Sequence, residues 1–237
     1  SMTGGTPAAL RINTRLAQAA EQFNIGMGVG SQRAGLLSSR LASTFKVVRK
    51  NAPNAFIFSN IGGAQLAEGL KTSSIRKLID MIDANALAIH LNPLQELVQP
   101  EGEPNFRGIL KRINELSKDL TIPIIVKEVG SGISPQVAVK LQKNNVSAIN
   151  VAGMGGTSWA GIEQKRAIKA NLSSKINMGL VLWDWGIPTA ASLLAAKKSV
   201  KLPLVSSGGM RSGLDLATVS YTHLTLPTIL LVEISVV

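Results

Sequence analysis

The sequence has 237 residues and no cysteine, which excludes disulfide bonds and thiolate metal sites. Aromatic residues make up only 4% of it, so stacking on nucleic-acid bases is poorly supported. The sequence contains no run of about 18 apolar residues, the length that crosses a membrane, and it does not open on a charged-then-apolar leader pattern. We therefore expect a cytoplasmic protein with neither a nucleic acid nor a membrane as its partner.

Acidic residues are scarce: 14 Asp and Glu stand against 25 Lys and Arg, which gives a net charge of +11. Such a balance suits nucleic acid, anionic lipid or a phosphorylated ligand. The basic residues are spread along the chain in small clusters such as Lys46–Lys50. Most are expected on a solvated outer surface, and a non-catalytic basic domain that binds polyanions is one alternative function.

Short apolar segments alternate with amphipathic helical patterns, at intervals of about 30 residues in the first half of the chain. Such βα units predict a parallel sheet. Each segment is followed by polar or glycine-rich residues, which favours a (β/α)8 TIM barrel with its site at the carboxyl ends of the strands. A doubly wound open sheet is the alternative. The six predicted strands are Ile25–Gly30, Phe56–Ser59, Ala86–Leu91, Ile122–Val126, Ala148–Val151 and Leu202–Val205.

The stretch Ala88–Glu96 holds the strongest candidate site. A predicted strand ends in His90, and Asn92, Gln95 and Glu96 follow at once. An imidazole, two amides and a carboxylate on a strand end are typical of a functional loop. The alternative at this point is a polar loop beside a core histidine.

Seven motifs then occur in an order that resembles type 2 isopentenyl diphosphate isomerases. The resemblance implies an FMN-dependent (β/α)8 enzyme of isoprenoid biosynthesis that converts isopentenyl diphosphate to dimethylallyl diphosphate. It also implies that reduced flavin acts in proton transfer without net redox change, that NADPH is the reductant, and that the parent protein is a homotetramer or homo-octamer. The motifs are SMTGG, GVGSQR, SNIGG, HLNPLQE, IVKEVG, GMGGTSW and SSGGMRSG.

The resemblance also implies roles for individual residues. Gln95 and His90 would be catalytic, and Glu96 would bind Mg²⁺. The substrate-binding residues would be Ser31, Gln32, Arg33, His90, Asn92 and Gln95. FMN would be held by Met2, Thr3, Gly4, Ser31, Asn60, Lys127, Thr157, Gly208, Gly209, Met210 and Arg211. Two alternatives stay open: Arg33 as a solvated charge at a helix start, and Lys127 as an ion-pair partner of Glu128.

Two departures from the family pattern lead to an expectation about the ends of the chain. Residues 1–217 are expected to form a partial barrel domain in which the first and eighth strands are missing or replaced. Thr218–Val237 lacks the family pattern, is not expected to form an amphipathic helix and is interpreted as a non-family, artefactual tail. We expect such a chain to fold poorly or to bind FMN weakly.

A second enzyme hypothesis is an FMN-dependent oxidoreductase of the 2-hydroxy-acid type, which shares the barrel. That chemistry needs a histidine and an arginine placed together on a carboxylate. The sequence has only two histidines, and His223 lies in the predicted tail. The pairing is therefore unsupported by the sequence.

Overall fold

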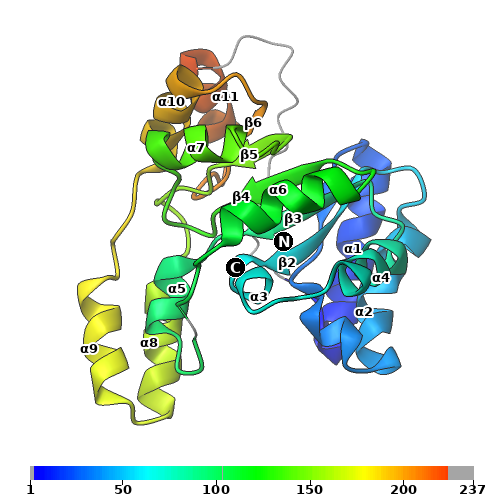
Figure 1. The fold of residues 1–237 in the computed structure, drawn as a ribbon, viewed down its shortest axis with the longest axis horizontal. Coiled ribbons are helices and arrows are strands. Elements are labelled where there is room, and N and C mark those ends of the chain that lie inside the picture. The colour runs from blue at the N-terminus through cyan, green and yellow to red at the C-terminus, as the bar shows by residue number, and fades with distance from the viewer. Residues whose placement is uncertain (1–2, 103, 224–237) are drawn as a thin grey trace.

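The computed structural model describes residues 3–102 and 104–223, and within them six strands form one parallel sheet (Figure 1). The strand order is β1-β2-β3-β4-β5-β6, so each strand pairs with the next along the chain. A doubly wound sheet would reverse its order part-way, so that alternative is wrong and the incomplete barrel is confirmed. The strands are β1 (Met27–Gly28), β2 (Ile57–Gly62), β3 (Ala86–His90), β4 (Ile124–Lys127), β5 (Ala148–Asn150) and β6 (Leu204–Val205).

Helices connect the strands, and several begin where capping residues predict. Thr6 accepts a hydrogen bond from the Ala9 amide, and Ser134 does the same for Val137, each directly before a proline. None of the described helices is both long and apolar enough to span a bilayer. The helices are α1 (Pro7–Phe23), the 3-10 helix η1 (Gln32–Leu36), α2 (Ser39–Asn51), α3 (Gly63–Ala67), α4 (Thr72–Met81), α5 (Pro93–Val98), α6 (Ile109–Asp119), α7 (Pro135–Gln142), α8 (Trp159–Lys169), α9 (Ser173–Val181), α10 (Thr189–Ser199) and α11 (Gly213–His223).

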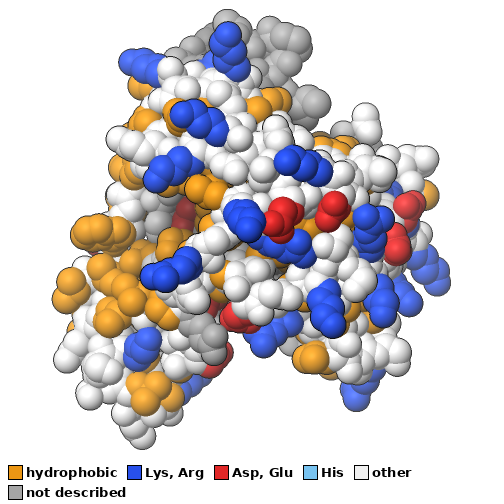
Figure 2. Space-filling view, in the orientation of Figure 1, with side chains coloured by type: hydrophobic (Ala, Val, Ile, Leu, Met, Phe, Trp, Pro, Cys, Tyr) orange, Lys and Arg blue, Asp and Glu red, His pale blue; other side chains and the backbone are white. Residues whose placement is uncertain are grey.

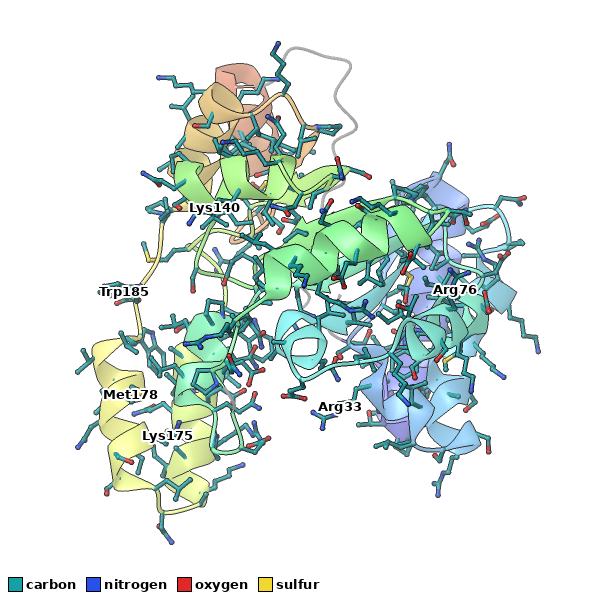
Figure 3. The ribbon with its side chains drawn as sticks, in the orientation of Figure 1. Arg33, Arg76, Lys140, Lys175, Met178 and Trp185 are labelled. Atoms are coloured by element: carbon teal, nitrogen blue, oxygen red, sulfur yellow. The ribbon has the colours of Figure 1, made fainter. Side chains whose placement is uncertain are left out.

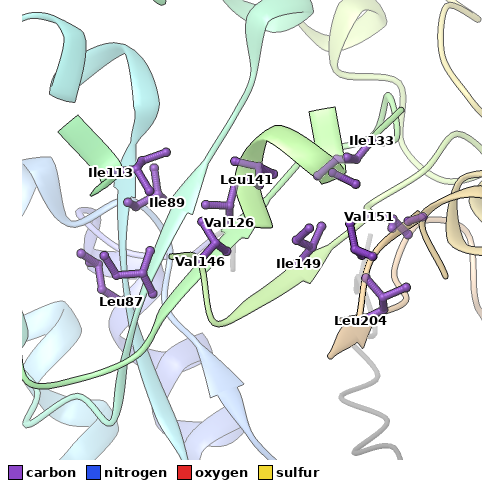
Figure 4. Close-up of a cluster of buried hydrophobic side chains, with 14 of the residues drawn as sticks. Leu87, Ile89, Ile113, Val126, Ile133, Leu141, Val146, Ile149, Val151 and Leu204 are labelled. Atoms are coloured by element: carbon purple, nitrogen blue, oxygen red, sulfur yellow. The ribbon is translucent and has the colours of Figure 1, made fainter. Parts of the chain in front are cut away.

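The main core lies between the sheet and its helices. Ile89, Val126, Ile149 and Leu204 are opposite one another on successive strands, and all four belong to one buried apolar cluster (Figure 4). Because side chains alternate along a strand, the residues between them point to the other face. At the carboxyl edge of the sheet this inner face carries polar side chains, such as His90 and Lys127, that can build a site.

The structure corrects several sequence-based boundaries. β2 runs on to Gly62, past Ser59, where we expected it to end. Residues 158–186 contain the hairpin of α8 and α9, which packs on α5 (Figure 1). α11 continues to His223, so residues 218–223, the first part of the segment interpreted as a tail, are helical. The rest of the predicted tail, 224–237, lies outside the described residues.

Candidate active site

Polar side chains meet in one row at the carboxyl ends of four neighbouring strands, β2 to β5. His90 is opposite Lys127 in the register of β3 and β4, and Lys127 is opposite Asn150 in that of β4 and β5. Asn60 lies two residues before Gly62, which is opposite His90. Partners in register share a face, and so do residues two apart on a strand. The four side chains therefore project from the same inner face.

A cavity of about 160 Å³ opens beside this row. It gathers five of the residues predicted for the site, which come from four strand ends and α5. It also includes Val129 and Trp159, which the sequence did not single out. The lining residues are Ser31, Asn60, His90, Gln95, Lys127, Val129 and Trp159.

His90 is held as a neutral imidazole. The Asn60 amide donates from Nδ2 to the Val29 carbonyl at 3.0 Å, so its Oδ1 faces the His90 Nδ1 at 2.9 Å. An amide oxygen only accepts, so the His90 proton is placed on Nδ1 and Nε2 is left as an acceptor. Burial, together with the nearby Lys127 charge, lowers the pKa of His90 to about 3.

Lys127 is buried, with 5% of its surface exposed. Its Nζ donates to the backbone carbonyl of Glu128 at 2.8 Å rather than to that residue's carboxylate. The Glu128 carboxylate instead accepts from the amides of Val129, Gly130 and Ser131, at 2.6 to 2.8 Å. Burial raises the pKa of Glu128, although these amides oppose that shift. The sequence-based alternative, an ion pair of Lys127 with Glu128, is therefore not the arrangement in this structure.

Two residues separate the end of β3 from the start of helix α5, which carries the rest of the HLNPLQE motif. Asn92 donates from Nδ2 to Glu96 at 2.9 Å and to the Gln95 Oε1 at 3.3 Å. The Gln95 Nε2 donates to Glu163 of α8 at 2.9 Å. Two buried atoms here lack a hydrogen-bond partner among the described residues: the Asn92 Oδ1 and the Trp159 Nε1. Such atoms are available to a ligand or to water.

Gln32 and Arg33 do not join the cavity. Gln32 is fully buried; its Oε1 accepts from Ser59 and from the Asn60 amide, and its Nε2 donates to the Leu78 carbonyl. These hydrogen bonds therefore connect the start of η1 to β2 and α4. Arg33 lines a separate hollow of about 400 Å³ beside α3 and α4, and its side chain projects away from the sheet (Figure 3).

The loops after β5 and β6, which carry the predicted FMN-binding residues Thr157 and Gly208–Arg211, lie against each other. A Cβ on Gly209 would stand 2.4 Å from the Gly155 carbonyl oxygen, and one on Gly208 would stand 2.1 Å from that of Gly153. Glycine is thus required where the loops after β5 and β6 touch. The backbone N–H groups of Arg211 and Ser212 donate to the Asp215 carboxylate.

The remaining predicted cofactor residues are dispersed around these loops. Thr157 is exposed, and its carbonyl is 3.3 Å from a Cβ built on Gly130. Met210 is buried in the main core.

The beginning of the chain is fastened beside β1. The amide of Gly30, just after that strand, donates to the Thr3 carbonyl at 2.9 Å. Gly4 packs against the ring of Phe45, which leaves no room for a Cβ. Thr3 and Gly4 therefore lie near the strand end where Ser31 enters the cavity. Met2, also predicted to contact FMN, lies outside the described residues.

A singly wound parallel sheet with polar groups at its carboxyl strand ends defines a protein of the α/β-barrel class. A mutant FabK from Thermotoga maritima shares this fold, with a TM-score of 0.56 and 15% sequence identity. The alignment covers 98% of this chain and 59% of that one. No family model matches the sequence.

Sequence comparison finds relatives that share one name. The chain is 49% identical over 217 residues to an isopentenyl-diphosphate delta-isomerase of Methanosarcina mazei, and 48% identical over 218 residues to one of a Synechococcus strain. Both alignments cover 92% of this chain, which spans 59% and 62% of the two relatives. The chain is therefore homologous to the isopentenyl-diphosphate delta-isomerases, and the resemblance noted in its motifs is confirmed.

The sequence reasoning missed Trp159, Val129 and Glu163. Trp159 ends the GMGGTSW motif, which could have indicated it. Val129 looks like any apolar residue after a strand. Glu163 lies in a helix that the periodicity did not reveal, and its position 68 residues beyond Gln95 gives no local signal.

Proposed function

We propose that this chain is the part of a type 2 isopentenyl-diphosphate delta-isomerase that holds its active site. The whole protein would convert isopentenyl diphosphate to dimethylallyl diphosphate with reduced FMN, Mg²⁺ and NADPH as reductant. One observation carries the proposal. Asn60, His90, Gln95 and Lys127 line one cavity in a chain that is 49% identical to an isopentenyl-diphosphate delta-isomerase. The homotetramer or homo-octamer expected for the parent protein stays a prediction.

The residues around the cavity fit a flavin. The Lys127 ammonium group would stabilise an anionic reduced ring, and the Asn60 amide would orient it. The unpartnered Trp159 N–H is a donor for a ligand acceptor. When bound, reduced flavin would supply the proton transfer at the allylic carbons. To bind the FMN phosphate, the Arg211 and Ser212 amides would first have to be released by the Asp215 carboxylate. Otherwise the backbone of Gly208–Met210 would bind the phosphate instead.

The neutral state of His90 limits what it can do for a diphosphate. With its proton on Nδ1, it presents Nε2 as an acceptor, which suits a water, a metal ion or a protonated phosphate oxygen. The negative charge must therefore be met elsewhere. Glu96 would hold Mg²⁺, with diphosphate oxygens and waters as the other ligands. Among the described residues, no group of three or more His, Cys, Asp or Glu side chains is placed to hold a metal ion, so a site with one protein carboxylate is what the proposal uses.

The cavity of about 160 Å³ is smaller than the roughly 300–1,000 Å³ of typical ligand sites. The wall formed by Gln95 and Trp159 would therefore move outward when flavin and substrate bind. Both residues belong to short helices beside the sheet rather than to the sheet itself.

Product analysis tests the proposal. The full-length protein, incubated without oxygen with FMN, NADPH, Mg²⁺ and isopentenyl diphosphate, should form dimethylallyl diphosphate while consuming far less NADPH than product. Steady NADPH oxidation without that product would contradict the proposal. The absorbance of this chain with added FMN, before and after dithionite, tests separately whether residues 1–237 suffice to hold the cofactor.

The two alternatives have less support. A 2-hydroxy-acid oxidoreductase needs a histidine and an arginine together, yet no arginine is among the described residues that line the cavity, and Arg33 borders another hollow. A polyanion-binding surface could use the outer groove between α2 and α4. There, however, Asp80 and Asp83 offset part of the charge of the four basic residues, Lys46, Arg49, Lys50 and Lys77. On the face shown in Figure 2 the basic side chains are spread out rather than gathered in one patch.

A further inference from the structure

A line of hydrogen bonds joins the cavity to the surface through α8. The Gln95 Nε2 donates to the Glu163 Oε1 at 2.9 Å, and the other oxygen of that carboxylate accepts from the Arg166 Nη1 at 2.6 Å. The second terminal nitrogen of Arg166 donates to Glu101 at 2.5 Å. Helices α5 and α8, which carry the inner end of this line, lie side by side (Figure 1).

We propose that Arg166 is a positioning residue: through the buried carboxylate of Glu163 it fixes which end of the Gln95 amide faces the cavity. The inference rests on the proposed function only in that Gln95 is taken to face the substrate. Nothing in the cavity row itself requires an arginine in α8, and Arg166 is not among the residues that line the cavity.

The burial of Glu163 gives Arg166 its importance. Only 3% of the Glu163 side chain is exposed, whereas 46% of the Arg166 side chain is. A buried carboxylate is costly to leave without a cation. Arg166 supplies a charge-assisted hydrogen bond from the solvent side and so holds the Glu163 carboxylate in place. Consistent with a tight cluster, the pKa of Arg166 is raised by Glu101 and Glu163.

An ionised carboxylate has a directional consequence for Gln95. It can only accept hydrogen bonds, so it must face the NH₂ end of the amide. The Gln95 Oε1 is then turned towards the Asn92 Nδ2, 3.3 Å away, and towards the cavity. Without Arg166 the carboxylate loses the partner that fixes its position, and the Gln95 amide is free to turn over and present NH₂ to the substrate. Arg166 therefore determines whether the cavity meets an acceptor or a donor at this position.

Three substitutions test this directly. Arg166→Gln removes the cation, Arg166→Lys keeps it, and Lys165→Gln removes an exposed charge from the same helix as a matched control. In protein labelled with ¹⁵N-glutamine, the side-chain NH₂ signal of Gln95 is assigned by its loss in Gln95→Glu. We expect that signal to move in Arg166→Gln and to keep its parent position in Arg166→Lys and Lys165→Gln.

Kinetics on the full-length enzyme supply the second measurement. We expect Arg166→Gln to lower kcat roughly tenfold or more with little change in KM, because a misplaced group acts on the reacting geometry, and Arg166→Lys to restore most of it. An unmoved Gln95 signal in a folded Arg166→Gln protein would overturn the inference. Equal loss in the Gln and Lys variants would also overturn it, since packing rather than charge would then be at work. If the parent forms no dimethylallyl diphosphate, the proposed function fails while the NMR signal still decides the inference.

Discussion

The two ends of the sheet differ in how their polar groups are satisfied. At the amino end, Arg49 donates to the carbonyls of Ala52, Ala55, Ile82 and Asp83 and to the Asn85 side chain. Among the described residues, three buried side-chain atoms lack a hydrogen-bond partner, and all three lie at the carboxyl end. They are Asn92 Oδ1, Trp159 Nε1 and Ser206 Oγ.

This contrast separates stability from function within one sheet. Buried polar groups left unpaired cost free energy, so a fold retains them where a ligand can complete their bonds. The amino end of a barrel sheet usually serves stability and the carboxyl end chemistry. Substitutions at the two ends should therefore differ in their effect on the free energy of unfolding.

The largest effect is expected at the amino end. Arg49→Ala would leave several partly buried carbonyls at the starts of β2 and β3 without donors. At about 1 kcal/mol for each lost bond, we expect the free energy of unfolding to fall by roughly 3–5 kcal/mol. Urea denaturation followed by circular dichroism would measure the shift in midpoint.

Arg40 provides the matched control, because it lies on the same helix with an exposed side chain. Arg40→Ala should change the unfolding free energy by less than about 0.5 kcal/mol. If the two alanine variants unfolded at the same urea concentration, Arg49 would not be the fastening point of the amino end.

At the carboxyl end, His90 should make stability depend on acid. Its pKa is about 3 in the folded protein against 6.5 as its ordinary value. The folded state therefore binds fewer protons, so the stability from His90 is complete above pH 6.5 and is lost as the pH falls towards 3. By pH 5 the loss would be about 2 kcal/mol, at about 1.4 kcal/mol for each pH unit.

His90→Gln isolates this effect, since a glutamine amide can still donate towards Asn60 but does not titrate. The difference in unfolding free energy between the parent and this variant should shrink by about 2 kcal/mol from pH 7 to pH 5. Other titrating groups cancel in that difference. A gap that stayed constant over this range would show that His90 is not held neutral by its surroundings.

Much of the fold could be predicted because local signals agree with it. Apolar runs indicate the six strands, and the pairs Thr6-Pro7 and Ser134-Pro135 are typical of helix starts, which the structure has there. Periodicity failed for α8 and α9, whose apolar residues Ile168, Leu180 and Val181 stay exposed. A helix that does not bury one continuous face carries no clear repeat.

The candidate site divides in the same way. Residues at strand ends, such as His90 and Lys127, were predicted because the carboxyl ends of parallel strands must meet. Gln32 and Arg33 follow β1 in the sequence too, but η1 turns one into the protein interior and the other towards a separate hollow. That turn depends on packing against β2 and α4, which no local pattern encodes.

A small change in stability is expected for Lys127→Met, at the carboxyl end. The substitution removes a buried charge that meets a backbone carbonyl, and an apolar side chain of similar length fits such a place without losing packing. We expect the free energy of unfolding to stay within about 1 kcal/mol of the parent or to rise, while the affinity for reduced FMN falls at least tenfold. Urea denaturation and a flavin titration under dithionite would give the two values. Because the Lys127 charge helps to lower the pKa of His90, the variant should also lose less stability in acid. A Lys127→Met protein that unfolded as readily as Arg49→Ala would mean that this lysine fastens the sheet, and the contrast between its two ends would not hold.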